Sequence, residues 1–315
     1  MVKNFADRLI EAIKTKGNPI CVGLDPRLNQ IPRFIKEKAL EGKGKTPTAA
    51  AADAIIEFNK GIIDEVADIV PVVKPQVAFY ELFGSEGVRA YEETLKYAKE
   101  NGLITIADMK RNDIGSTATA YAQGILGEVE MFENEHEVVM PIFDADSVTV
   151  NAYLGWDGIK PFVNECDRYG KGIFILAKTS NPSSGDLQDL QLKDGPSVYE
   201  MMGHLIDSWG ADHIGESGYG FVGAVTGATY PQQASKLRQI MSNSIFLVPG
   251  YGAQGGGAKD ILNCFNEDGL GAVVSSSRGI IFAYEKLEGF SEKDYAKAAR
   301  QACINMQEDL RSVGL

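Results

Sequence analysis

The sequence is poor in the residues that build metal centres and disulfide frameworks. Its 315 residues include only four cysteines and three histidines. Cys21, Cys166, Cys264 and Cys303 lie far apart, in apolar or helical contexts, and show no metal-ligand spacing. We therefore expect reduced, structural thiols. The histidines also lack a common spacing, so the sequence predicts no metal site.

Long apolar runs and an excess of positive charge are missing as well. No apolar stretch reaches the roughly 18 residues of a membrane-spanning helix, and no signal peptide is recognisable, so we expect a cytoplasmic protein. The net charge is −12, which makes nucleic acid and anionic membranes poor partners. No linker rich in proline or serine divides the chain. We expect one domain over residues 1–315, with surface insertions at Lys36–Pro47 and Glu128–Glu137.

What the chain does contain is one repeated unit, an apolar strand followed by an amphipathic helical stretch. Eight such units in about 250–300 residues predict a (β/α)₈ barrel, an α/β fold with a parallel eight-stranded barrel. A leading helix near Asn4–Lys16 is expected to cover the bottom of the barrel. An open, doubly wound sheet is the alternative, but no Gly-x-Gly-x-x-Gly motif follows the first strand. The expected strands are Pro19–Leu24, Ile69–Val73, Leu103–Ala107, Ser147–Val150, Gly172–Ala177, Phe221–Val225, Ile245–Val248 and Ala272–Ser275.

The third expected strand leads into the most informative segment, residues 106–114. It places Asp108, Lys110 and Asp113 at the carboxyl end of the strand, where barrel enzymes carry their chemistry. Side chains alternate along an extended segment, so Asp108 and Lys110 are expected on one side. Such crowded charges are costly unless they pair with each other or with a substrate.

Other strand ends bring further polar residues to the same face. The first strand ends at Asp25 and the second at Lys74, while Ser180 follows the fifth. The seventh leads into residues 249–257, which include five glycines and Gln254, and the eighth leads into Arg278. A glycine-rich loop opposite an arginine suits a phosphate dianion, through oriented N–H groups and a bidentate guanidinium.

Taken together, these segments resemble the orotidine monophosphate decarboxylase family, in particular its longer bacterial-type branch. The resemblance runs in order from about residue 19 to 280. It rests on five segments: Val22-Gly23-Leu24-Asp25, the Lys74 segment, residues 108–114, Pro249–Gly256 and Ser277-Arg278-Gly279. It implies conversion of orotidine 5′-monophosphate to uridine 5′-monophosphate and CO₂, the last step of de novo pyrimidine nucleotide synthesis, without metal or organic cofactor.

The resemblance also implies a role for each site residue. Lys110 would protonate C6 of the pyrimidine, flanked by the carboxylates of Asp108 and Asp113, with Lys74 completing an alternating network of charges. The partner subunit of a homodimer would contribute Asp113, Ile114 and Thr117. The implied substrate contacts are Asp25 and Thr117 to the ribose, Ser180 to the pyrimidine, and Gln254, Arg278 and Gly279 to the phosphate. Ser277 and Asn181 depart from the family, which often has glycine and histidine there.

Two other functions are compatible with the pattern. One is a Mg²⁺-dependent phosphosugar decarboxylase or aldolase of the same superfamily. Those relatives resemble one another in placing a metal-binding glutamate where this chain has Lys74, and an ammonium there would repel a divalent ion. The other is a non-catalytic phosphate-binding barrel, which would have no reason to keep four alternating charges at its mouth.

Overall fold

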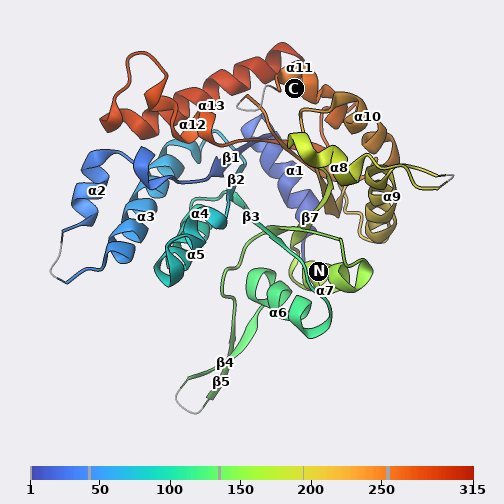
Figure 1. Cartoon of the computed structure of the whole chain (residues 1–315), viewed down its shortest axis with the longest axis horizontal. Helices are drawn as coiled ribbons and strands as arrows, with labels where there is room; N and C mark the ends of the chain where they lie inside the picture. The colour runs from blue at the N-terminus through green and yellow to red at the C-terminus, as the bar shows by residue number, and fades with distance from the viewer. Residues whose placement is uncertain (1, 42–43, 134–135, 194, 253–255) are drawn as a thin grey trace.

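The computed structural model describes residues 2–41, 44–133, 136–193, 195–252 and 256–315. Eight parallel strands close into a barrel in the order β1-β10-β9-β8-β7-β6-β3-β2, with helices around it (Figure 1). The expected fold class is thus confirmed. The barrel strands are β1 (Ile20–Leu24), β2 (Val72–Pro75), β3 (Ile104–Arg111), β6 (Ser147–Val150), β7 (Gly172–Lys178), β8 (Gly220–Thr226), β9 (Ser244–Pro249) and β10 (Ala272–Ser276).

The strands form where the sequence is apolar without alternation, because both of their faces are covered. Every residue of β1, β2, β6, β8 and β10 is buried. Most strand boundaries lie within one residue of the expectation, but β3 ends four residues later than expected and β2 starts three residues late. Strand β2 begins at Val72 and not at Ile69, because the N–H groups of Ile69 and Val70 bond to the carbonyl of Val66 and close the preceding helix.

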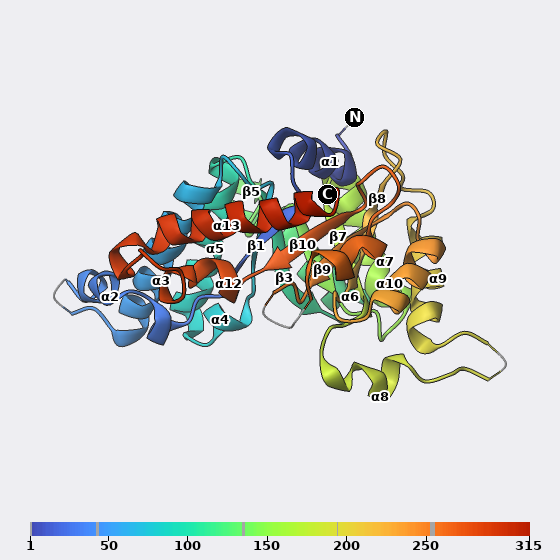
Figure 2. The same ribbon diagram turned by 90° about the horizontal axis from the view of Figure 1, so that it is seen from above.

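Helices cover the outside of the barrel, and the C-terminal helix crosses one side of it (Figure 2). Short 3₁₀ segments lie at Leu28–Gln30, Pro182–Ser184, Leu262–Cys264, Ala283–Glu285 and Glu292–Asp294. The α-helices are α1 (Phe5–Lys16), α2 (Arg33–Ala39), α3 (Pro47–Val66), α4 (Ala78–Glu81), α5 (Gly84–Glu100), α6 (Gly115–Leu126), α7 (Trp156–Tyr169), α8 (Gly185–Gln188), α9 (Val198–Gly210), α10 (Pro231–Ile240), α11 (Ala258–Ile261), α12 (Arg278–Ile281) and α13 (Tyr295–Ser312).

The leading helix α1 lies at the amino-terminal ends of the strands, as expected. The ring of Phe5 packs edge-on against Phe174 of β7, with 6.1 Å between ring centroids. A β-carbon at Gly172, the first residue of β7, would lie 2.2 Å from the Phe5 ring. Glycine is therefore required where the helix meets the strand, and the bottom of the barrel is filled by packing.

The two expected surface insertions take different forms. The first, Lys36–Pro47, spans the end of α2 and the first residue of α3. The second, Glu128–Glu137, falls in an antiparallel hairpin of β4 (Val129–Glu133) and β5 (His136–Met140) that projects from the barrel (Figure 1).

Two further properties follow from the described residues. All four cysteines are free and buried, and burial raises the pKa of Cys21 to about 12. Among the helices of the described chain, none is both long and apolar enough to cross a membrane.

Candidate active site

Three charged side chains meet at the carboxyl ends of β2 and β3. The ammonium nitrogen of Lys74 lies 2.9 Å from Oδ2 of Asp108, and that of Lys110 lies 2.6 Å from Oδ1. Lys74 and Asp108 are each only 6% exposed, whereas the side chain of Lys110 is 44% exposed. One buried carboxylate is thus shared between a buried ammonium and one that reaches the open mouth of the barrel.

A residue that the sequence did not single out holds this arrangement in place. The hydroxyl of Thr149, on β6, donates to Oδ1 of Asp108 at 2.8 Å. It also accepts from the backbone N–H groups of Met109 and Lys110, each at 3.0 Å. Thr149 therefore fixes both the carboxylate and the backbone that carries Lys110.

The backbone at Lys110 departs from the regular strand that we expected. Its φ is +48°, in the left-handed region that non-glycine residues seldom adopt, and the pairing of β3 with β6 shifts between Ala107 and Arg111. Such an irregularity re-aims a side chain and is common beside active sites. Lys110 reaches Asp108 through this bulge and not through simple alternation along the strand.

The charges of the cluster determine its protonation. Burial by itself would raise the pKa of Asp108, but the ammonium groups of Lys74 and Lys110 outweigh burial and hold that pKa well below its usual range. Burial would likewise lower the pKa of Lys74, but the carboxylates of Asp108 and Asp25 raise it. Asp108 and Lys74 are therefore a fixed anion and a fixed cation near neutral pH.

Asp25 supplies a further carboxylate at the mouth of the barrel. It follows β1 directly, is half-buried, and its charge adds to the field that raises the pKa of Lys74. Its Oδ1 atom is buried without a hydrogen-bond partner among the described residues. A buried acceptor of this kind is costly unless a ligand or water completes it. Asp25 thus brings a carboxylate oxygen that is unpaired in the described part of the chain to the end of β1, close enough to Lys74 to raise its pKa.

The loop after β7, residues 179–188, carries Ser180. We call the residue pairs that join the two ends of this loop its neck. The ammonium of Lys178 is fully buried and donates to Oδ1 of Asp189 at 2.8 Å. One residue further in, Gln188 accepts from the N–H of Thr179 and donates to its hydroxyl. Two adjacent pairs of residues therefore tie the start of the loop to its end.

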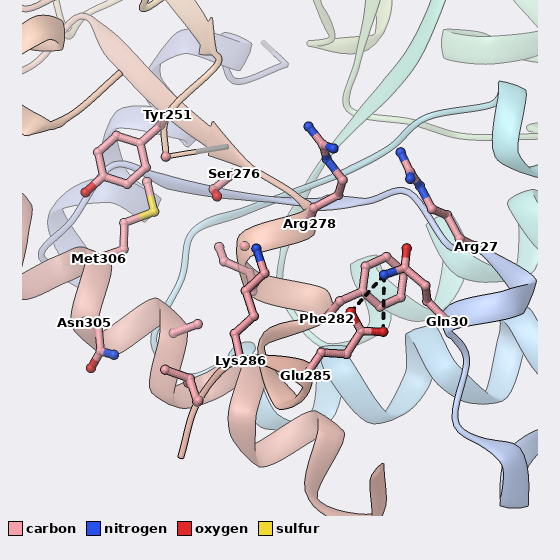
Figure 3. Close-up of a pocket in the computed structure, with 15 residues that line it drawn as sticks. Arg27, Gln30, Tyr251, Ser276, Arg278, Phe282, Glu285, Lys286, Asn305 and Met306 are labelled. Carbon is pink, nitrogen blue, oxygen red and sulfur yellow. Dashed lines mark hydrogen bonds between the residues drawn. The ribbon is translucent and has the colours of Figure 1, made fainter. Parts of the chain in front are cut away.

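Described residues that follow β9 and β10 border a cavity of about 580 Å³ (Figure 3). Arg278 and Gly279 line it, and both are exposed. Gln254, which we expected to bind phosphate, lies outside the described residues.

The structure does not bring Asp113 to Lys110 within one chain. Oδ1 of Asp113 accepts from the N–H of Ile114 at 2.8 Å, and within the described ranges Asp113 forms no ion pair with Lys110. Ile114 is exposed despite its apolar side chain, as is Thr117 in the first turn of α6. Within the described residues, Asp113 is thus bound to the backbone of its neighbour and not to the cluster.

Metal ligands are not gathered anywhere in the described part of the chain. No group of three or more His, Cys, Asp or Glu side chains there is arranged to hold a metal ion. The chemistry of the mouth is that of ammonium and carboxylate groups.

Comparison with known proteins gives a consistent family. Residues 18–290 match the model described as "Orotidine 5'-phosphate decarboxylase / HUMPS family". The chain is 46% identical over 311 residues to orotidine 5'-phosphate decarboxylase of Rhodopirellula baltica, covering 98% of this chain and 99% of that one. It is 40% identical to the protein of that name in Caldicellulosiruptor bescii, covering 98% of each chain. Among solved structures, it is similar to the OMP decarboxylase of Leishmania donovani, with a TM-score of 0.71, 28% identity and 98% of each chain covered.

Proposed function

Because the chain belongs to the orotidine 5'-phosphate decarboxylase / HUMPS family, we propose that it converts orotidine 5′-monophosphate to uridine 5′-monophosphate and CO₂. This carboxy-lyase reaction belongs to pyrimidine nucleotide biosynthesis. The observation that carries the proposal is the hydrogen-bonded cluster of Lys74, Asp108 and Lys110 at the barrel mouth.

The reaction needs electrostatic stabilisation more than it needs bond-making by the protein. Breaking the bond between C6 and the carboxylate leaves an electron pair on C6 that the pyrimidine ring delocalises poorly. Enzymes lower barriers by about 8–23 kcal/mol, and a preorganised charge at the reacting atom is usually the largest contribution. The ammonium of Lys110 is such a charge, because Asp108 and the bulge in β3 fix its position.

In the proposed step, CO₂ leaves and Lys110 donates a proton from Nζ to C6. The carbon gains the C–H bond of uridine 5′-monophosphate, and Lys110 takes up a proton from solvent before the next turnover. Both lysines bind Asp108, but Lys74 does not donate, because it is buried whereas Lys110 is partly exposed. The role of Lys74 is to keep Asp108 ionised, which orients Lys110.

We assign the substrate's three parts to three regions of the mouth. Asp25 binds the ribose through the carboxylate oxygen that has no partner among the described residues, together with Thr117 of a second subunit. Ser180 binds the pyrimidine. Arg278, Gly279 and Gln254 bind the phosphate, whose remote binding energy can be used at the reacting carbon. Asp113 and Ile114 of the second subunit complete the site, so the active form is a homodimer.

The test is a spectrophotometric assay with orotidine 5′-monophosphate as substrate, with and without EDTA. We expect loss of the substrate's absorbance and formation of uridine 5′-monophosphate at a rate that EDTA leaves unchanged. A rate that vanishes with EDTA and returns with Mg²⁺ would assign the chain to the metal-dependent members of the superfamily. No turnover with or without Mg²⁺ would contradict the decarboxylase function altogether.

A further inference from the structure

The 580 Å³ cavity beside the barrel mouth is larger than the proposed reaction requires. It lies between the residues after β1, Tyr251 and Gly252 after β9, α12 and α13 (Figure 3). Arg278 lines it, but Lys110, Asp108 and Ser180 do not. The volume of this cavity falls within the range of roughly 300–1,000 Å³ that is typical of small-molecule sites. A single phosphate group would fill only a small part of it. A ligand group that enters the cavity must therefore be attached at the phosphate end of the nucleotide.

Three cationic side chains line this cavity, and they have no anionic partner in the described structure. They are Arg27, Arg278 and Lys286. Figure 3 shows both guanidinium groups on one side of the cavity, with the ammonium of Lys286 rising from its floor toward Ser276.

The local surroundings of these cations leave them available to a ligand. Arg27 lies beside the ring of Phe79, 5.7 Å from its centroid, and its Nε atom is buried without a partner among the described residues. The one carboxylate at the rim, Glu285, accepts from the side-chain amide of Gln30 at 3.0 and 3.2 Å. Like charges that share a cavity repel one another, and an anion between them offsets that cost.

We propose that this cavity is a binding site for the second phosphate of a nucleoside 5′-diphosphate, with uridine 5′-diphosphate as the ligand. The inference rests on the proposed function, because the first phosphate occupies the Arg278 site and the uridine occupies the mouth. Lys286 and Arg27 then bind the terminal phosphate. Uridine 5′-diphosphate competes with the substrate, and enzyme activity responds to the level of a more highly phosphorylated uridine nucleotide.

The test compares two inhibitors on the same enzyme. Inhibition constants of uridine 5′-diphosphate and uridine 5′-monophosphate are measured against orotidine 5′-monophosphate for the wild type, Lys286→Met and Lys293→Met. Lys286 is exposed, so the variant should fold, and Lys293 is an exposed lysine of the same C-terminal region that does not line the cavity. We expect Lys286→Met to weaken inhibition by the diphosphate about tenfold, as loss of one charge-assisted hydrogen bond does, and to change inhibition by the monophosphate little. Lys293→Met should change neither constant.

Three results would overturn the inference. The diphosphate fails to compete with substrate, Lys286→Met has no effect on it, or Lys286→Met weakens both inhibitors by the same factor. Calorimetric titration of uridine 5′-diphosphate into wild type and Lys286→Met, without substrate, separates this inference from the proposed reaction. Binding that depends on Lys286 in a protein without turnover would keep the site and contradict the decarboxylase function. Absence of diphosphate binding in a protein that turns over substrate would contradict the diphosphate site and keep the decarboxylase function.

Discussion

At the residue scale, the carboxylate of Asp108 receives hydrogen bonds from Lys74, Lys110 and Thr149. Buried ion pairs contribute little net stability, but removing one partner is strongly destabilising because a charge remains in the interior. Lys110 differs from Lys74 in this respect, since its side chain is partly exposed. The cluster therefore separates a structural cation from a reactive one, and substitutions of the two lysines should have different consequences.

Substitution of the reactive lysine should remove activity and leave the fold intact. In Lys110→Ala we expect kcat for orotidine 5′-monophosphate to fall by at least about 10³-fold, because both the proton donor and the charge beside C6 are lost. The circular dichroism spectrum and the melting temperature should change little. Retention of even about a tenth of wild-type kcat would contradict the role of Lys110.

Substitution of the structural lysine should instead cost stability, in a way that depends on Asp108. Lys74→Met leaves a buried carboxylate without its principal counter-ion, and we expect the free energy of unfolding to fall by about 3 kcal/mol near pH 7. The double variant Lys74→Met/Asp108→Asn is the matched control, since it removes the charge that was left unpaired. It should recover part of the loss in urea denaturation. Equal stability of the single and double variants would show that the pair is not coupled.

The same cluster predicts how stability depends on pH. The pKa of folded Asp108 lies below its unfolded value of about 3.9, so the unfolded chain binds the proton first as the pH falls. The stabilisation is complete above that value and is lost as the pH falls through the folded pKa. Lys74 shows the opposite sign, because its raised pKa confers stability below the unfolded value of about 10.4 that is lost at higher pH.

Denaturation curves should therefore show a contribution from this pair that is constant between about pH 5 and pH 9. In Lys74→Met the pKa of Asp108 is lowered less, so the stability lost on acidification should be smaller than in the wild type and the loss should end at a higher pH. Identical acid limbs for the two proteins would contradict the assigned cause of the shift.

Sequence reasoning found Lys74, Asp108 and Lys110 because their charges follow predicted buried strands. It could not find the left-handed backbone at Lys110 or the role of Thr149. Both depend on the register between β3 and β6, which the sequence of either strand alone does not determine. A hydroxyl residue one position before the end of β6 was the only available signal for Thr149.

At the scale of elements, the loop after β7 illustrates how a long connecting segment is given a defined position. Lys178 lies between the rings of Tyr230 and Tyr199, 4.5 and 5.9 Å from their centroids, and binds Asp189 at the far end of the loop. A β-carbon on Gly227, which follows β8, would lie 2.8 Å from the backbone nitrogen of Ser180. The loop is thus held at its neck by an ion pair and at Ser180 by close packing.

Loss of the ion pair between Lys178 and Asp189 at the neck of the loop should weaken substrate binding more than it slows the reaction. We expect Lys178→Met to raise KM for orotidine 5′-monophosphate about tenfold, the equivalent of roughly 1.4 kcal/mol of positioning, with a smaller change in kcat. Asp189→Asn, which keeps the shape of the partner, should give an intermediate effect.

Lys171 offers a matched control next to the opposite end of the same strand. It precedes β7, is also buried, and pairs with Asp144 at 2.6 Å. Lys171→Met should reduce the melting temperature without raising KM. If the two lysine variants lose stability equally and neither changes KM, the neck has only a structural role.

Element boundaries were predictable wherever apolar runs are bounded by polar residues, as in the fourth strand, Ser147–Val150. The late start of β2 was not, because Ile69 and Val70 are apolar yet serve to end α3. A run of apolar residues indicates that a segment is buried but does not distinguish a buried helix end from a buried strand.

At the scale of the whole molecule, the proposed function implies a site that two chains share. Asp113 is bound to its neighbour Ile114, and Ile114 is half exposed. Other exposed apolar residues gather along the same sequence region, on α6 and before and within α7, and exposed apolar surface of this kind marks interaction sites. They are Tyr121, Tyr153, Leu154 and Trp156. The sequence of a single chain cannot place residues across a two-fold axis, so the assignment of Asp113 to a partner came from the family resemblance and remains a prediction.

In the proposed dimer, Lys110 of one subunit acts with Asp113 of the other, and an experiment with exchanged subunits can detect this. Lys110→Ala and Asp113→Ala homodimers should each be nearly inactive. Mixing them under conditions of verified exchange makes about half of the dimers mixed, each with one doubly altered site and one intact site. We predict recovery of about a quarter of wild-type activity toward orotidine 5′-monophosphate, because about a quarter of all sites are then intact. If each site were built within one chain, every site would still carry one substitution and activity would not return. Absence of recovery after verified exchange would therefore contradict the shared site.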